Sequence, residues 1–117
     1  PLDQALIAWL KKISHKYQLI MVSNQIEDWI EEMLRKNHDL RKLFYLTANS
    51  YELGFKKPDP RIFQAALVKV GVQPREALLI DDCEINILAA KKLGLDAIKY
   101  ENFDDFEKKF RKIEENY

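Results

Sequence analysis

The chain has 117 residues, room for one domain of common size, and nearly half of them are hydrophobic, which argues against disorder. Its 19 basic and 19 acidic residues cancel, so no overall charge would draw it to nucleic acid or to an anionic membrane. No apolar run is long enough to span a membrane, and the single cysteine cannot form an internal disulfide. We therefore expect a soluble, cytoplasmic protein with neither nucleic acid nor a membrane as its partner.

The first half of the sequence alternates helix and strand patterns. Residues 1–16 carry apolar residues at helical spacing, and the short apolar run 19–22 is rich in β-formers. Ser23 and Asn24 end this predicted strand, and a second helical stripe follows, formed by Ile26, Trp29, Ile30, Met33 and Leu34. The remaining expectations in this half are a polar turn at 37–41, a strand at 43–47 and a loop at 49–57.

The second half repeats the alternation. Pro60 suits the first turn of a helix that Asp59 caps and Gly71 ends. A strand at 77–80 stops at two acids, Asp81 and Asp82. The elements that follow are a helix striped by Ile85, Leu88, Ala89 and Leu93, a strand at 96–100, and a last helix striped by Phe103, Phe106, Phe110 and Ile113. The alternation predicts an α/β fold, a parallel sheet with helices on both faces.

The adjacent acids stand where a ligand site is expected, since ligands of open α/β sheets sit beyond the carboxyl ends of the strands. Two carboxylates forced together repel each other unless a cation lies between them, and Mg²⁺ prefers oxygen ligands. Asp81 and Asp82 are therefore candidate metal ligands. The alternative is that Asp81 merely caps the next helix, with Glu84 as its capping-box partner.

Two further stretches carry candidate phosphate ligands. Ser23 and Asn24 end a strand and precede a helix, whose N-terminus favours an anion. Lys57 precedes a rigid Pro-Asp-Pro turn and could hold a fixed positive charge beside a phosphoryl oxygen. The alternatives are a plain helix cap at Ser23 and an exposed basic pair at Lys56 and Lys57.

Three stretches, in this order and spacing, resemble the haloacid dehalogenase-like hydrolases of the phosphatase type. "LIMVSN" is similar to the second family motif, an apolar strand ending in Ser or Thr. "SYELGFKKPDPRIFQAAL" is similar to the segment that carries the motif lysine, which corresponds to Lys57. "ALLIDDCEINILAAKKLGLDAIKY" resembles the fourth motif in its double-aspartate form. The resemblance covers roughly residues 1–100 and implies a Rossmann-like three-layer sandwich.

The resemblance also implies roles for the candidate residues. Ser23 and the main chain of Asn24 would bind the transferred phosphoryl group, and Lys57 would steady the nucleophile and the phosphate. Asp81 would coordinate Mg²⁺, while Asp82 would hold metal-bound water or make a second contact. The substrate would be a small phosphorylated metabolite. Cys83 departs slightly from the family pattern, and no histidine pattern supports it as a nucleophile.

A larger departure is the missing first family motif, Asp-x-Asp, which supplies the nucleophile and the general acid/base. No such pair occurs in the sequence, so we expect the chain alone to be inactive. The family's cap domain and central first strand are missing too, which would leave the strands at 19–22 and 77–80 with unpaired edges. A segment before residue 1 or a second chain would supply them, or the two halves would pair directly.

Two classes of function follow for this single core domain, residues 1–117. The first is the rear portion of a Mg²⁺-dependent phosphatase, with 2-haloacid dehalogenation as a related enzymatic alternative. The second is a non-catalytic domain that uses the inherited fold for binding or assembly. The acid pair favours the phosphatase over the dehalogenase, because it is suited to a metal.

Overall fold

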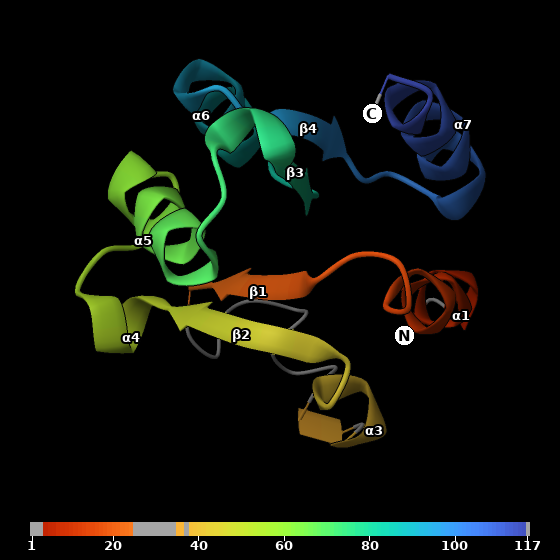
Figure 1. The fold of residues 1–117 in the computed structure, drawn as a ribbon, viewed down its shortest axis with the longest axis horizontal. Helices are drawn as coiled ribbons and strands as arrows, with labels where there is room; N and C mark the ends of the chain where they lie inside the picture. The colour runs from red at the N-terminus through yellow and green to blue at the C-terminus, as the bar shows by residue number, and fades with distance from the viewer. Residues whose placement is uncertain (1–3, 25–34, 37, 117) are drawn as a thin grey trace. The chain divides into compact units, whose positions relative to one another are not determined.

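The structure is a computed structural model that describes residues 4–24, 35–36 and 38–116 (Figure 1). The chain divides into two compact units, Pro1–Lys57 and Pro58–Tyr117. The described strands form two parallel two-stranded sheets, one in each unit. No helix within the described ranges has both the length and the apolar character needed to cross a membrane.

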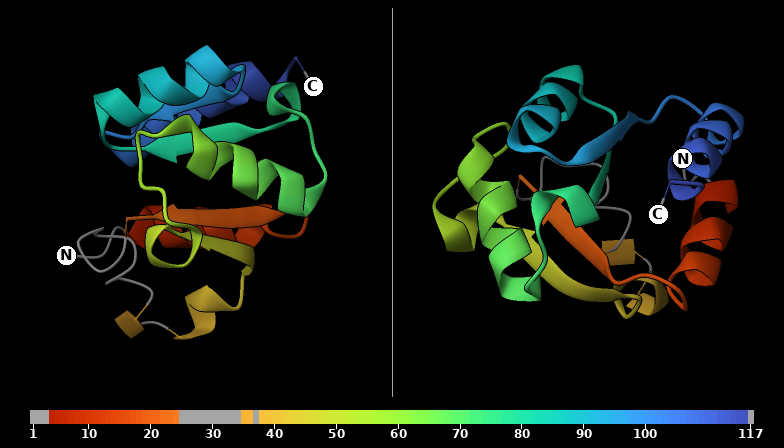
Figure 2. Two further views of the ribbon diagram at one scale, coloured as in Figure 1. Left: turned by 90° about the vertical axis from the view of Figure 1, so that its left-hand side faces the viewer. Right: turned by 45° about the horizontal axis from the view of Figure 1, so that its top comes forward.

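The first unit is built on a parallel strand pair. Its elements are α1 (Gln4–Ile13), β1 (Leu19–Ser23), α3 (His38–Arg41), β2 (Phe44–Asn49) and α4 (Ser50–Leu53). β1 and β2 lie side by side in Figures 1 and 2, and their register runs to the pair Ser23 and Asn49. Ile7, Met21 and Leu40 form the buried cluster of this unit, so α1, β1 and α3 share one core.

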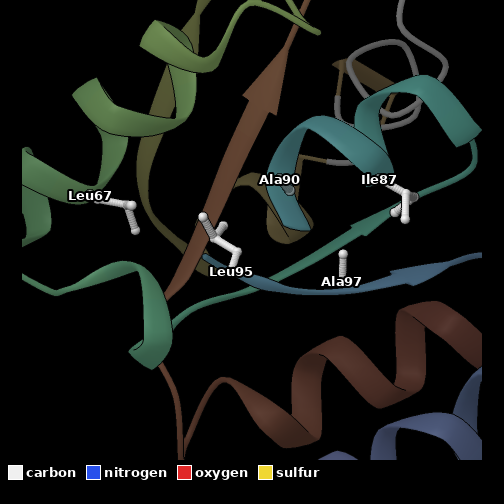
Figure 3. Close-up of a cluster of buried hydrophobic side chains, with 5 residues drawn as sticks. All are labelled: Leu67, Ile87, Ala90, Leu95 and Ala97. Atoms are coloured by element: carbon white, nitrogen blue, oxygen red, sulfur yellow. The ribbon is translucent and has the colours of Figure 1, made fainter. Parts of the chain in front are cut away.

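The second unit has the same plan. Its elements are α5 (Pro60–Val70), the 3₁₀ helix η2 (Pro74–Glu76), β3 (Leu78–Asp81), α6 (Glu84–Leu93), β4 (Asp96–Lys99) and α7 (Phe103–Glu114). β3 and β4 are parallel, and their register ends at the pair Asp81 and Lys99. Figure 3 shows the buried cluster that joins α5 and α6 to β4, made by Leu67, Ile87, Ala90, Leu95 and Ala97.

The ends of α5 follow the sequence prediction. The Asp59 side chain accepts the backbone N–H of Arg61 at 2.9 Å, and Pro60 occupies the first turn. The hydrogen bond from the Arg61 side chain is the main reason why the pKa of the Asp59 carboxyl lies below its ordinary value. Gly71 ends the helix with φ of 80°, a left-handed conformation that favours glycine. Both ends of α5 are thus set by local sequence.

The predicted face of α6 is only partly right. Leu93 packs against the buried cluster of this unit and Ala89 is half-buried, as predicted. Ile85 and Leu88 are 62% and 57% exposed, whereas Asn86, Ile87 and Ala90 are buried. The helix packs Ile87 and Ala90 into the cluster with β4, and this rotation turns Asn86 inward. A short helix with apolar residues on several sides does not reveal its buried face by periodicity alone.

Other expectations fared as follows. The four strands lie at the predicted places within one or two residues. The expected turn at 37–41 is wrong, because α3 occupies most of it and buries Leu40, and the expected loop at 49–57 contains α4. The predicted helix over Ile26–Leu34 lies outside the described residues. The single domain over residues 1–117 stays a prediction.

Candidate functional site

Ser23 stands at the carboxyl end of β1, where the sequence analysis placed it. It is the last residue of the strand, pairs in register with Asn49, and is only 1% exposed. A hydroxyl at such a depth needs hydrogen-bond partners. Its place at the end of a parallel strand is the position where α/β folds present ligand-binding groups. The helix cap proposed as the alternative falls on residues beyond those described.

Asn24 follows directly and binds the main chain of Lys57 with both ends of its amide. The side-chain Oδ1 of Asn24 accepts the Lys57 backbone N–H at 2.8 Å, and its Nδ2 donates to the Lys57 carbonyl oxygen at 3.1 Å. The two residues are 33 positions apart in the chain. The structure therefore brings the second motif and the motif lysine together within the first unit.

Lys57 is not one of an exposed basic pair. The whole residue is only 8% exposed, whereas its neighbour Lys56 is exposed. Lysine is seldom buried in proteins unless it has a charged or hydrogen-bonding partner. The burial of Lys57 therefore indicates a specific role that Lys56 does not share. The alternative of two solvated lysines is wrong for Lys57 and right for Lys56.

Asp81 is the last residue of β3 and its carboxylate is held at both oxygens. Oδ1 accepts the backbone N–H of Cys83 at 2.8 Å, and Oδ2 accepts Nδ2 of Asn86 at 3.2 Å. The Asp81 carbonyl oxygen accepts the backbone N–H of Tyr100 at 2.8 Å. Asp81 is 9% exposed, so a carboxylate is fixed at the end of this strand and barely reached by solvent.

These contacts decide against the capping-box alternative. α6 begins at Glu84 with Cys83 as its N-cap, and the Cys83 side chain makes no cap hydrogen bond. Asp81 lies two residues before that N-cap position, and its side chain closes a turn onto Cys83 instead. Asp82, the next residue, is exposed, and so is Cys83.

Asn86 is the residue of this site that the sequence analysis missed. It is buried on the first turn of α6 and its amide reaches the Asp81 carboxylate. The available signal was one polar residue within the otherwise apolar stretch 85–90 of this helix. The sequence analysis placed Ile85 and Leu88 on the inward side and gave Asn86 no role.

The donor chemistry at the end of β3 fits a hard divalent cation. Asp81 and Asp82 offer carboxylate oxygens, the ligands that Mg²⁺ prefers. The two hydrogen bonds to Asp81 fix the carboxylate and leave further lone pairs on its oxygens for a cation. Within the described ranges, no three His, Cys, Asp or Glu residues gather as a metal cluster, so additional ligands would have to complete the coordination.

The sequence-predicted residues thus fall into two groups. Ser23, Asn24 and Lys57 belong to the first unit, with Asn24 joined to Lys57. Asp81 and Asp82 belong to the second unit, where Asn86 joins Asp81. Both histidines, His15 and His38, are exposed.

Comparisons with known proteins agree with the motifs. A family model for haloacid dehalogenase-like hydrolases matches residues 2–94. D-ribitol-5-phosphate phosphatase of Bacteroides thetaiotaomicron is 31% identical over 102 residues, which are 86% of this chain and 50% of that protein. Glyceraldehyde 3-phosphate phosphatase of Pyrococcus furiosus is 31% identical over 106 residues, which are 87% of this chain and 42% of that protein.

A solved structure extends the likeness to three dimensions. It is a haloacid-dehalogenase family enzyme of Bacteroides thetaiotaomicron, wild type, in complex with magnesium and inorganic phosphate. It is 28% identical with a TM-score of 0.70, and the match covers 86% of this chain and 53% of that one. The chain spans about half or less of the length of these curated relatives. The resemblance and the Rossmann-like fold class are confirmed, and the chain belongs to the haloacid dehalogenase-like hydrolases.

Proposed function

We propose that this chain is the phosphate-holding and metal-holding portion of a Mg²⁺-dependent phosphatase that acts on small phosphorylated metabolites. The observation that carries the proposal is the Asp81 carboxylate, buried at the end of β3 and held by Cys83 and Asn86. Two relatives that are named phosphatases of small phosphorylated compounds support the substrate class, and the magnesium and phosphate bound to a neighbour support the cofactor.

Each proposed residue has a task suited to its surroundings. Ser23 and the main chain of Asn24 would hydrogen-bond the phosphoryl oxygens at the end of β1. Buried Lys57 would neutralise charge on the transferred group, an interaction that is strengthened by exclusion of water. Asp81 and Asp82 would hold the cation. When bound, Mg²⁺ would neutralise charge that develops on the phosphoryl oxygens.

The nucleophile that the proposed reaction requires is not among these 117 residues. The sequence holds no Asp-x-Asp pair, the family motif that attacks the phosphorus atom and handles the proton. We propose that an additional segment or a second chain supplies this motif, together with the strand and the cap domain that the resemblance implies. Without that motif, the same side chains would bind phosphate and a cation but would not hydrolyse a substrate.

Hydrolysis of p-nitrophenyl phosphate by the native protein, with and without Mg²⁺, tests the proposal directly. The intact mass of that protein should be measured in parallel. A mass above 13.9 kDa with Mg²⁺-dependent release of nitrophenol is expected. No hydrolysis at either Mg²⁺ level would contradict the phosphatase and leave the binding or assembly domain, and release of halide from a 2-haloacid would identify the dehalogenase.

Asn86 is expected to matter for the cation although it would not touch it. Asn86→Ala removes the donor to Oδ2 of Asp81, so the carboxylate loses part of its orientation. Loss of such an outer partner weakens metal affinity by about 10- to 100-fold. Calorimetric titration with Mg²⁺ measures this, with Lys92→Ala, an exposed residue of the same helix, as the control. Equal Mg²⁺ affinities in the two variants would show that Asn86 serves packing only.

A further inference from the structure

The Asn24 side chain binds one residue of the chain through both of its polar atoms. Its oxygen and its nitrogen bind the N–H and the C=O of Lys57, at 2.8 and 3.1 Å. Asparagine is suited to this because its amide carries a donor and an acceptor side by side, whereas aspartate offers acceptors only and alanine offers neither. The two hydrogen bonds resemble those between paired residues of neighbouring β-strands, except that here a side chain takes the place of one main chain.

Lys57 has particular need of such a partner. It is buried and lies in a segment without regular structure between α4 and α5, where no ladder satisfies its main chain. A buried backbone N–H and C=O left unpaired cost free energy. Pro58 follows and restricts the backbone conformation of Lys57, which lies in a turn.

We infer that Asn24 is a positioning residue for Lys57: it fixes the main chain from which the lysine side chain starts. This inference rests on the proposed function, since it assigns Asn24 to the charge of Lys57 and not to the phosphate through its own side chain. The earlier expectation that the Asn24 main chain contacts phosphate is compatible with it and stays a prediction. A side chain that is misplaced by about 1 Å can cost a reaction about 100-fold.

A double-mutant cycle on p-nitrophenyl phosphate hydrolysis tests the inference in the native protein with Mg²⁺. Asn24→Ala is expected to lower kcat by about 10- to 100-fold, with Mg²⁺ affinity unchanged. Adding Asn24→Ala to Lys57→Ala is expected to cause little further loss, because Asn24 acts through Lys57. Losses that multiply across the two sites would overturn the inference and indicate an independent contact with the phosphate.

Hydrogen exchange at the Lys57 backbone N–H gives a second measurement that needs no activity. The Asn24 oxygen should protect this N–H in the unmutated protein, and Asn24→Ala should remove the protection. Asn24→Asp keeps the acceptor and should retain it, provided that thermal unfolding shows each variant to be folded. Unchanged protection in a folded Asn24→Ala variant would overturn the inference that Asn24 fixes the Lys57 main chain. Absence of hydrolysis by the unmutated protein would overturn the proposed function. Hydrogen exchange would still show whether Asn24 fixes the Lys57 main chain.

Discussion

Asp81→Asn is expected to abolish Mg²⁺-dependent hydrolysis by the native protein while leaving the fold intact. The substitution keeps the size of the side chain and an oxygen that can accept the Cys83 N–H. It removes the negative charge that the cation would require. Loss of transition-state stabilisation of this kind costs about 10²- to 10³-fold in kcat. The measurements are kcat on p-nitrophenyl phosphate and Mg²⁺ affinity by calorimetry.

The control for Asp81→Asn is Asp104→Asn, which removes an exposed carboxylate from α7 in the same unit. Circular dichroism and the thermal midpoint should match the unmutated protein for both variants. Normal hydrolysis and normal Mg²⁺ affinity in Asp81→Asn would place the metal elsewhere. Loss of hydrolysis with full Mg²⁺ affinity would contradict the metal role and leave Asp81 as a residue that orders the loop after β3.

The strands were predictable because each is a short apolar run that ends at polar residues. The runs at 19–22 and 77–80 lie within one residue of β1 and β3, and α5 begins and ends where Pro60 and Gly71 indicate. Backbone geometry at proline and glycine and the burial of continuous apolar runs are local properties. They can be determined from neighbouring residues without knowledge of the fold.

The face of a short helix depends on what packs against it. α6 has apolar residues on several sides, and its contact with β4 selects Ile87 and Ala90 over Ile85 and Leu88. That choice is made by tertiary contacts, which no window of the sequence contains. The miss at Asn86 has the same origin, since its side chain faces Asp81 only in this rotation of the helix.

The residues of the candidate site were predictable from the sequence, but the hydrogen bonds that connect them were not. The sequence indicates Ser23, Lys57 and Asp81 through strand ends and motif order. It does not reveal that Asn24 binds the main chain of Lys57, because the contact joins residues 33 positions apart through one amide. Long-range hydrogen bonds of single side chains leave no periodic pattern, so they have to be read from the structure.

Lys57 and Lys56 offer a matched pair of substitutions, because the two lysines are neighbours that differ in burial. Lys57→Ala is expected to lower kcat on p-nitrophenyl phosphate by about 10²- to 10³-fold, since it removes a fixed positive charge from a site with little water. Lys56→Ala changes the net charge by the same amount and should leave kcat close to that of the unmutated protein. The measurement is kcat for both variants at saturating Mg²⁺.

Mg²⁺ affinity separates the lysine from the aspartate. Lys57→Ala should bind Mg²⁺ as the unmutated protein does, whereas Asp81→Asn should not, because only the carboxylate is proposed to hold the cation. Equal kcat in Lys57→Ala and Lys56→Ala would make Lys57 a buried structural lysine. A loss confined to Lys57→Ala, with Mg²⁺ still bound, would separate charge neutralisation by the first unit from metal binding by the second.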